Sequence, residues 1–95
     1  MVKLQPGQLV RSLAGRDKDK HYLVLREIDD KYVLLVNGSN RPVDQPKKKN
    51  KVHLQHYNRK AEIDELIEAG KLNDSYVIEH LKKLVPETGI PEEEV

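Results

Sequence analysis

Short apolar runs bounded by turn residues fill the first sixty residues and limit what the chain can fold into. Residues 22–28 and 32–36 are rich in β-branched and aromatic side chains, and only three residues separate them. Such runs are too short for amphipathic helices and favour two antiparallel strands joined by a tight turn. Asn37-Gly38, residues that tolerate a positive φ, end the second of these strands.

Three more extended segments are expected in this part of the chain. They are the run from Leu9 to Leu13, a short piece at residues 41–43 and a last strand from Val52 to about Tyr57. The lysine-rich tract after Pro46 is expected to be a loop. Five short strands can protect their edges by curling into a small barrel. The sequence therefore predicts a mainly β first half.

The apolar spacing changes to a helical period after residue 60. Ile63, Leu66 and Ile67 share one helical face, and Gly70 suits the residue just past the helix end. Asn73, Asp74 or Ser75 can cap a second helix that runs to about Leu84, with an apolar stripe of Val77, Leu81, Leu84 and Val85. We therefore expect a barrel at residues 1–58, an acidic helical hairpin at 59–85 and a disordered tail at 86–95.

The net charge of +1 hides a division at the same place. Residues 1–60 carry 14 Lys and Arg against 6 Asp and Glu, whereas residues 61–95 carry 3 against 10. A basic half joined to an acidic one indicates a polyanion-binding surface on the β part. The alternative for any single lysine run is a solvated loop that only keeps the protein soluble.

The candidate RNA-binding residues lie in two basic segments and around the last strand. Lysines in a row suit phosphates, and their binding would gain mostly from counterion release. Tyr57 is expected at the surface, whereas Tyr22 and Tyr32 are expected to be mainly structural. His53 or His56 is a candidate hydrogen-bond partner of a phosphate or base. The full set is Arg16, Lys18, Lys20, Arg41, Lys47, Lys48, Lys49, Lys51, His53, Tyr57 and Arg59.

Signatures of other functions are missing from the sequence. It has no Cys, no Gly-rich phosphate loop and no nucleophile elbow, so neither an enzyme nor a cofactor is expected. His53 and His56 would point to opposite faces of a strand, so no metal site is expected either. The apolar runs are too short to span a bilayer and the N-terminus lacks a secretory pattern, which makes the cytoplasm the expected compartment.

One stretch resembles a known family. Residues 7–18 (GQLVRSLAGRDK), the strand at 22–28 and the tract YVLLVNG at 32–38 look like a KOW domain. The likeness is greatest to bacterial KOW-domain RNA-binding proteins, which are similar to KOW-containing large-subunit ribosomal proteins of archaea and eukaryotes. Arg41-Pro42 and PKKKNKVHL at 46–54 match the basic tract that follows in this group. The resemblance covers about the first sixty residues and implies a five-stranded SH3-like barrel that binds RNA, often ribosomal RNA.

The chain departs from the KOW pattern at one position. Asp19 stands where the pattern has a glycine in the loop before the second strand. Asp is among the few residues that accept a left-handed conformation, so the turn is compatible with it. A carboxylate nevertheless enters a loop that is expected to approach phosphate, which leaves the RNA contact of this loop open.

Three roles stay open for the acidic half. The helices at residues 61–84 could dock a basic protein partner, which would make the chain an interaction module of the translation or transcription machinery. The acidic half could also fold over the basic surface as an internal mimic of RNA. Finally, the helices could complete the hydrophobic core, because a sixty-residue barrel is marginal by itself.

Overall fold

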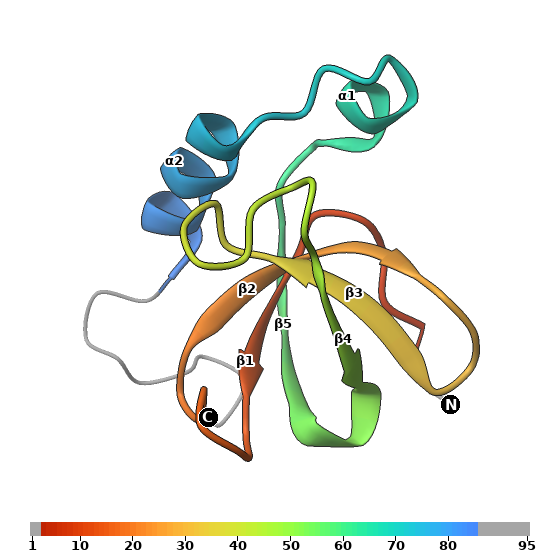
Figure 1. Cartoon of the computed structure of the whole chain (residues 1–95), viewed down its shortest axis with the longest axis vertical. Coiled ribbons are helices and arrows are strands. Elements are labelled where there is room, and N and C mark those ends of the chain that lie inside the picture. Colours follow the sequence, from red (N-terminus) through yellow and green to blue (C-terminus); the bar gives the residue numbers. More distant parts are fainter. Residues whose placement is uncertain (1–2, 86–95) are drawn as a thin grey trace.

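The computed structural model describes residues 3–85, which form a curved antiparallel sheet with helices on one side (Figure 1). The five strands are β1 (Gln8–Ser12), β2 (His21–Glu27), β3 (Tyr32–Val36), β4 (Lys47–Asn50) and β5 (Leu54–Lys60). A 3-10 helix, η1 (Lys51–His53), links the last two strands, and the helices α1 (Asp64–Glu68) and α2 (Asp74–Leu84) follow. None of these helices has the length and apolar character needed to cross a membrane.

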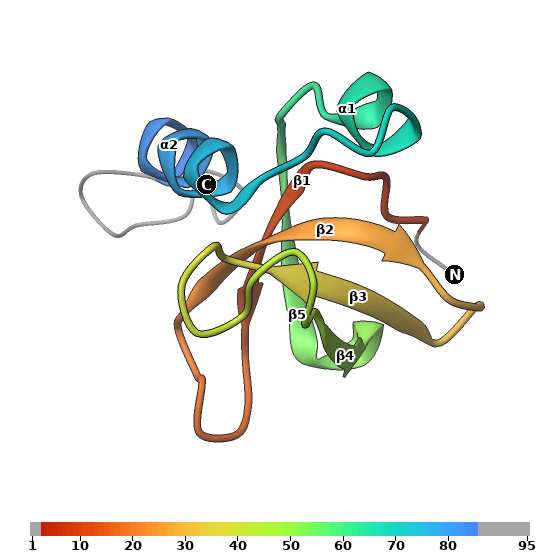
Figure 2. The ribbon, with the colours of Figure 1, turned by 45° about the horizontal axis from the view of Figure 1, so that its top comes forward.

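The sheet has the order β4-β3-β2-β1-β5. The first four strands meander, and β5 then returns to pair with β1 (Figure 2). Register shifts between Gln8 and Val10 and between Val24 and Arg26 bend the strands, as β-bulges do. The two edges, β4 and β5, are not paired with each other in the described residues, so the sheet is not a closed barrel. The mainly β architecture with a helical appendage is confirmed.

The central hairpin forms as its sequence predicts. β2 and β3 pair antiparallel, with Leu23 opposite Val36 and Glu27 opposite Val33. The turn between them is held by Asp29, whose carboxylate oxygen Oδ1 accepts hydrogen bonds from the backbone N–H groups of Lys31 and Tyr32, both at 2.8 Å. Hydrogen bonds of this kind are the reason that Asp is favoured in tight turns.

The fourth strand lies elsewhere than expected. Residues 41–43 belong to a loop, and the lysine tract predicted as a loop forms the edge strand β4. Leu35 pairs with Lys47 and Tyr32 with Asn50, so pairing with β3 overrides the weak strand preference of lysine. The last strand begins at Leu54 rather than Val52, because residues 51–53 form η1.

The hydrophobic core is divided between the two faces of the sheet. The sheet-interior cluster lies within the curved sheet and contains Leu4, Val10, Tyr22, Val24, Val33, Leu35 and Leu54. The helix-facing cluster contains Leu9, Leu23, Val36, Tyr57, Ala61, Ile63 and Val77. Neighbouring residues such as Leu9 and Val10 enter different clusters because strand side chains alternate between faces. The sheet is therefore covered on both faces, and residues of the acidic half supply part of the core.

The second helix has the predicted bounds, whereas the first is shorter than expected, because β5 continues to Lys60 and α1 begins at Asp64 with Ile63 as its N-cap residue. Asn73 caps α2, its side chain accepting a hydrogen bond from the Tyr76 N–H, and α2 ends at Leu84. Val77 is fully buried, and Leu81, Leu84 and Val85 pack against the helix-facing cluster. Gly70 follows α1 with a φ of 66°. The predicted disordered tail at residues 86–95 lies outside the described residues.

Candidate nucleic-acid interface

A buried carboxylate lies at the centre of the two predicted basic segments. Asp17, in the β1–β2 loop, is only 6% exposed. Its Oδ2 accepts hydrogen bonds from the Nζ of Lys47 at 2.7 Å and the Tyr22 hydroxyl at 3.0 Å. Its Oδ1 accepts from the Ser12 hydroxyl at 2.8 Å and the Nζ of Lys49 at 3.2 Å. Asp17 thus joins the loop to a strand thirty residues further along the chain.

Strand geometry explains why Asp17 is bonded to Lys47 and Lys49 but not to Lys48. Alternate residues of a strand point to the same side, so Lys47 and Lys49 both face the loop. Lys48 points to the other side, where its Nζ lies 4.5 Å from the centre of the Tyr32 ring, in a cation–π geometry. The Nζ of Lys49 also donates to the backbone carbonyl of Ala14 at 3.0 Å.

The β1–β2 loop is folded back on itself by backbone hydrogen bonds. The N–H of Asp19 donates to the Ser12 carbonyl at 2.8 Å, and the N–H of Lys20 donates to the Asp17 carbonyl at 3.0 Å. Asp19 has a φ of 71°, the left-handed conformation expected where the KOW pattern has glycine. The loop therefore holds its shape with Asp at this position, and it presents Arg16, Lys18 and Lys20 at its exposed surface.

Opposing effects act on the two acidic groups of this network. Burial by itself raises the pKa of Asp17, but the hydrogen bonds from Lys47, Ser12, Lys49 and Tyr22 outweigh it and hold the pKa well below its usual value. Burial and the hydrogen bond to Asp17 raise the pKa of the Tyr22 hydroxyl to about 12, and the charge of Arg41 opposes this rise. Asp17 is therefore a carboxylate and Tyr22 a neutral phenol at neutral pH.

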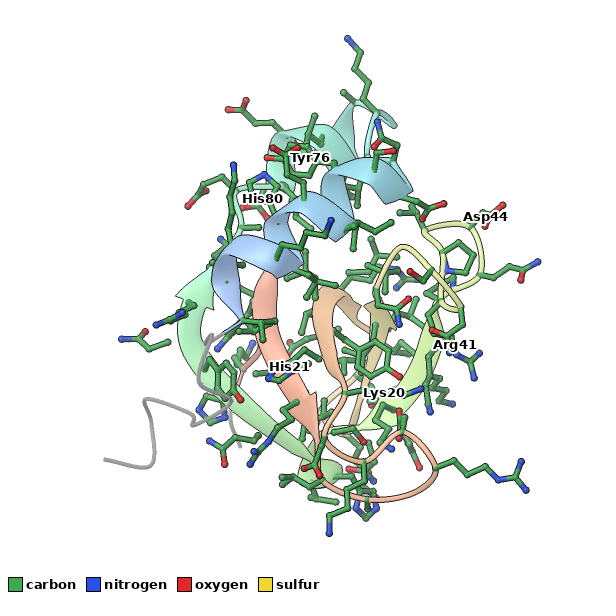
Figure 3. The ribbon with its side chains drawn as sticks, turned by 90° about the vertical axis from the view of Figure 1, so that its left-hand side faces the viewer. Lys20, His21, Arg41, Asp44, Tyr76 and His80 are labelled. Carbon is green, nitrogen blue, oxygen red and sulfur yellow. The ribbon has the colours of Figure 1, made fainter. Side chains whose placement is uncertain are left out.

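We call six cationic side chains of the β1–β2 loop, the β3–β4 loop and β4 the basic surface. They are Arg16, Lys18, Lys20, Arg41, Lys47 and Lys49. Among the described residues, Lys20 and Arg41 have no ion-pair partner. Figure 3 shows both on loops of the sheet, away from Tyr76 and His80 on α2. The structure thus brings together two basic segments that lie far apart in the sequence.

Other predicted site residues lie outside this surface. Lys51 forms an ion pair of 2.5 Å with Glu27, whose Oε2 also accepts from the Leu4 N–H. Arg59 donates from Nη1 to the carbonyl of Leu84 at 2.7 Å, which ties β5 to the end of α2. His53 is exposed on η1, and its backbone carbonyl accepts the N–H of Leu13 at 2.8 Å.

The expectation that Tyr57 lies at the surface is wrong. Its side chain is 1% exposed within the helix-facing cluster, and its hydroxyl lies 3.0 Å from Nε2 of His21. The chain has no Phe or Trp, so Tyr is the only large ring with which it can fill its core. The same reason accounts for the burial of Tyr22, which is also 1% exposed.

The described part of the acidic half, residues 61–85, has a smaller excess of negative charge than the whole half. Residues 61–85 carry six Asp and Glu against three Lys, and the remaining four acids of the half follow residue 85. Asp74 has a structural role, because its Oδ1 accepts the N–H of Val43 at 2.8 Å and so fixes the β3–β4 loop. A cavity of about 390 Å³ is lined by Glu62, Asp64, Glu65, Leu66 and Tyr76.

Two further observations bear on the kind of site. Within residues 3–85, no three His, Asp or Glu side chains are grouped as they would be to hold a metal ion. A scan of the sequence against models of protein families and a search of curated proteins found no match.

Proposed function

We propose that this chain is an RNA-binding protein that grips backbone phosphates with its basic surface. The observation that carries the proposal is the pair of salt bridges from Lys47 and Lys49 to Asp17, which place β4 beside the basic β1–β2 loop. Six cations beside two carboxylates, the buried Asp17 and the exposed Asp19, leave an excess of positive charge. Clustered Lys and Arg side chains are the electrostatic footprint of a nucleic-acid site.

The resemblance to KOW domains narrows the proposal. The likeness of residues 7–18, 22–28, 32–38 and 46–54 supports RNA as the ligand, with ribosomal RNA or the ribosome as the setting. An SH3-like interpretation of the fold is part of the same proposal. Its support is the bent five-stranded sheet in which β5 returns, through a 3-10 turn, to pair with β1.

The salt dependence of RNA binding tests this function. If about five phosphates are neutralised, the logarithm of the affinity should fall with the logarithm of the salt concentration at a slope of roughly −3.5 to −4.5. The measurement is fluorescence anisotropy of a labelled ribosomal-RNA fragment over a series of salt concentrations. A flat response, or no binding at low salt, would contradict RNA binding through phosphates.

The acidic cavity favours a second candidate function, the docking of a basic protein partner. Its three carboxylates surround Leu66 and Tyr76, a combination that suits the stem and charged head of a Lys or Arg side chain. A pull-down from a cell extract, with and without nuclease, separates the two functions. Partners that survive nuclease support protein docking, whereas loss of all partners supports binding through RNA.

A further inference from the structure

Contacts between the β1–β2 loop and β4 converge on the two inward-facing lysines. Lys47 and Lys49 donate to the Asp17 carboxylate, and Lys49 donates to the carbonyl of Ala14 as well. The side chains of these lysines are 22% and 12% exposed, and that of Asp17 is 9% exposed. These ion pairs are therefore shielded from water and from salt to a degree that surface pairs are not.

The position of Asp17 raises a question about its effect on RNA binding. A carboxylate in a phosphate-binding surface repels phosphate, and its replacement by a neutral side chain would raise the net charge of the chain from +1 to +2. If affinity followed charge alone, such a variant would bind RNA more tightly. The geometry points the other way, because the same carboxylate holds the two basic segments together.

We propose that Asp17 is a positioning residue for phosphate binding, which fixes the β1–β2 loop against β4 so that both segments meet one RNA backbone. Arg16, Lys18 and Lys20 then bind on a loop that is already ordered, so little conformational entropy is lost on binding. Without this carboxylate, the repulsion between Lys47 and Lys49 is no longer compensated, and the loop keeps the Lys49–Ala14 hydrogen bond to the strand but loses both ion pairs. This inference rests on the proposed RNA-binding function.

The substitution Asp17→Asn distinguishes the effect of the negative charge of Asp17 from its effect on the position of the loop. Asn keeps the size of the side chain and part of its hydrogen bonding but removes the negative charge. We expect the variant to bind the ribosomal-RNA fragment about threefold more weakly or worse at equal salt, although it is more basic. We also expect its salt slope to be shallower by about one or two units, because fewer phosphates are contacted at once.

Two outcomes of this experiment would overturn the inference. The first is affinity equal to or tighter than that of the unmodified chain, which would mean that Asp17 acts only through its charge. The second is weaker binding with an unchanged slope, which would indicate a general loss of folded protein rather than a lost set of phosphate contacts. Circular dichroism at the assay temperature gives the folded fraction of each variant.

A milder variant keeps the inference testable if Asp17→Asn does not fold. Ser12→Ala removes the hydroxyl whose oxygen lies 2.8 Å from Oδ1 of Asp17 and 3.0 Å from the carbonyl oxygen of Ala14, and it changes no charge. We expect weaker RNA binding at unchanged net charge, and binding equal to that of the unmodified chain would overturn the inference. If the unmodified chain itself shows no salt-dependent binding, the proposed function fails first.

Discussion

The side chains of the basic surface differ in how freely their charged groups can bind a phosphate. Lys47 and Lys49 already donate hydrogen bonds to Asp17, whereas Lys20 is exposed and has no ion-pair partner among the described residues. An exposed ammonium on an ordered loop can contact a phosphate without breaking an existing bond. Substitution of Lys20 therefore tests RNA binding more directly than substitution of the lysines in β4.

Lys20→Ala should weaken RNA binding and make the salt slope shallower by about one unit, because one phosphate contact is lost. Lys82→Ala is the matched control, since Lys82 is an exposed lysine on α2, outside the basic surface. Affinities measured by anisotropy at several salt concentrations give both slopes. Equal effects of the two substitutions would mean that only the net charge of the chain matters.

Tyr22 should make the stability of the fold depend on alkaline pH. Its pKa is raised from 10.0 to about 12 in the folded chain, because burial and Asp17 both disfavour the phenolate. The protonated phenol therefore stabilises the fold fully below pH 10, and this contribution, on the order of 2–3 kcal/mol, is lost as the pH rises from 10 to 12.

The measurement is urea unfolding at pH 9 and near pH 12, compared with the same series for Tyr22→Phe. The variant cannot form a phenolate, so it should lose less stability over this interval, while the titration of lysines affects both chains alike. Equal losses in the two chains would contradict the assigned role of the Tyr22–Asp17 hydrogen bond.

The residues at the centre of the site show what the sequence could not reveal. Asp17 stands between Arg16 and Lys18 and looks like one charge among several in a polar loop. Only the fold shows that it is buried, since burial depends on the return of β4 to this loop. Tyr57 is the opposite case, because its flanking His and Asn made it look exposed, although the helical segment covers the face of β5 on which it lies.

Elements formed by local signals were predicted well, and elements formed by long-range pairing were not. The β2–β3 hairpin follows from two apolar runs and an Asp turn, and α2 follows from the Asn73 cap and its apolar stripe. The strand β4 has no apolar pattern of its own. It is a strand because it pairs with the edge of β3. The sequence KKKN by itself does not indicate this pairing, because the pairing depends on residues elsewhere in the chain.

The connection between the sheet and the helical segment depends on Gly7. Its N–H donates to the Val24 carbonyl at 2.7 Å, and its own carbonyl accepts the N–H of Ala61 at 2.9 Å. Its φ is 87°, and a Cβ at this position would collide with the Ala61 carbonyl. Glycine is therefore required here both for backbone conformation and for space.

Gly7→Ala should destabilise the fold by about 2 kcal/mol more than Gly70→Ala, because the clash adds to the cost of the left-handed backbone. Gly70 is the matched control, since its φ is 66° but no atom lies within 4 Å of a Cβ built there. Urea unfolding of both variants gives the difference. Equal losses would show that the backbone around Ala61 moves aside at no cost.

For the whole molecule, the question is what the helical segment does. Ala61, Ile63 and Val77 share a core cluster with Leu9 and Leu23 of the sheet. This arrangement favours the role in which the helices complete the core, the third possibility considered from the sequence. It also leaves the acidic cavity at the surface, where a partner could still bind.

Ile63→Ala should destabilise the whole fold by about 2–5 kcal/mol, because it opens a cavity between the helical segment and the sheet. Ile28→Ala makes the same change at a residue that is 41% exposed, and it should cost much less. Thermal unfolding followed by circular dichroism compares the two. A small effect of Ile63→Ala, with the strands intact, would mean that the sheet is stable without its helical cover.

In the proposed complex, RNA contacts the β1–β2 loop and β4 together as one surface. NMR chemical-shift mapping with the ribosomal-RNA fragment at low salt tests this most directly. We expect the amide signals of residues 13–20 and 47–49 to shift along one binding curve, while those of residues 64–84 stay in place. Shifts confined to the helical segment, or shifts of the loop without β4, would contradict it.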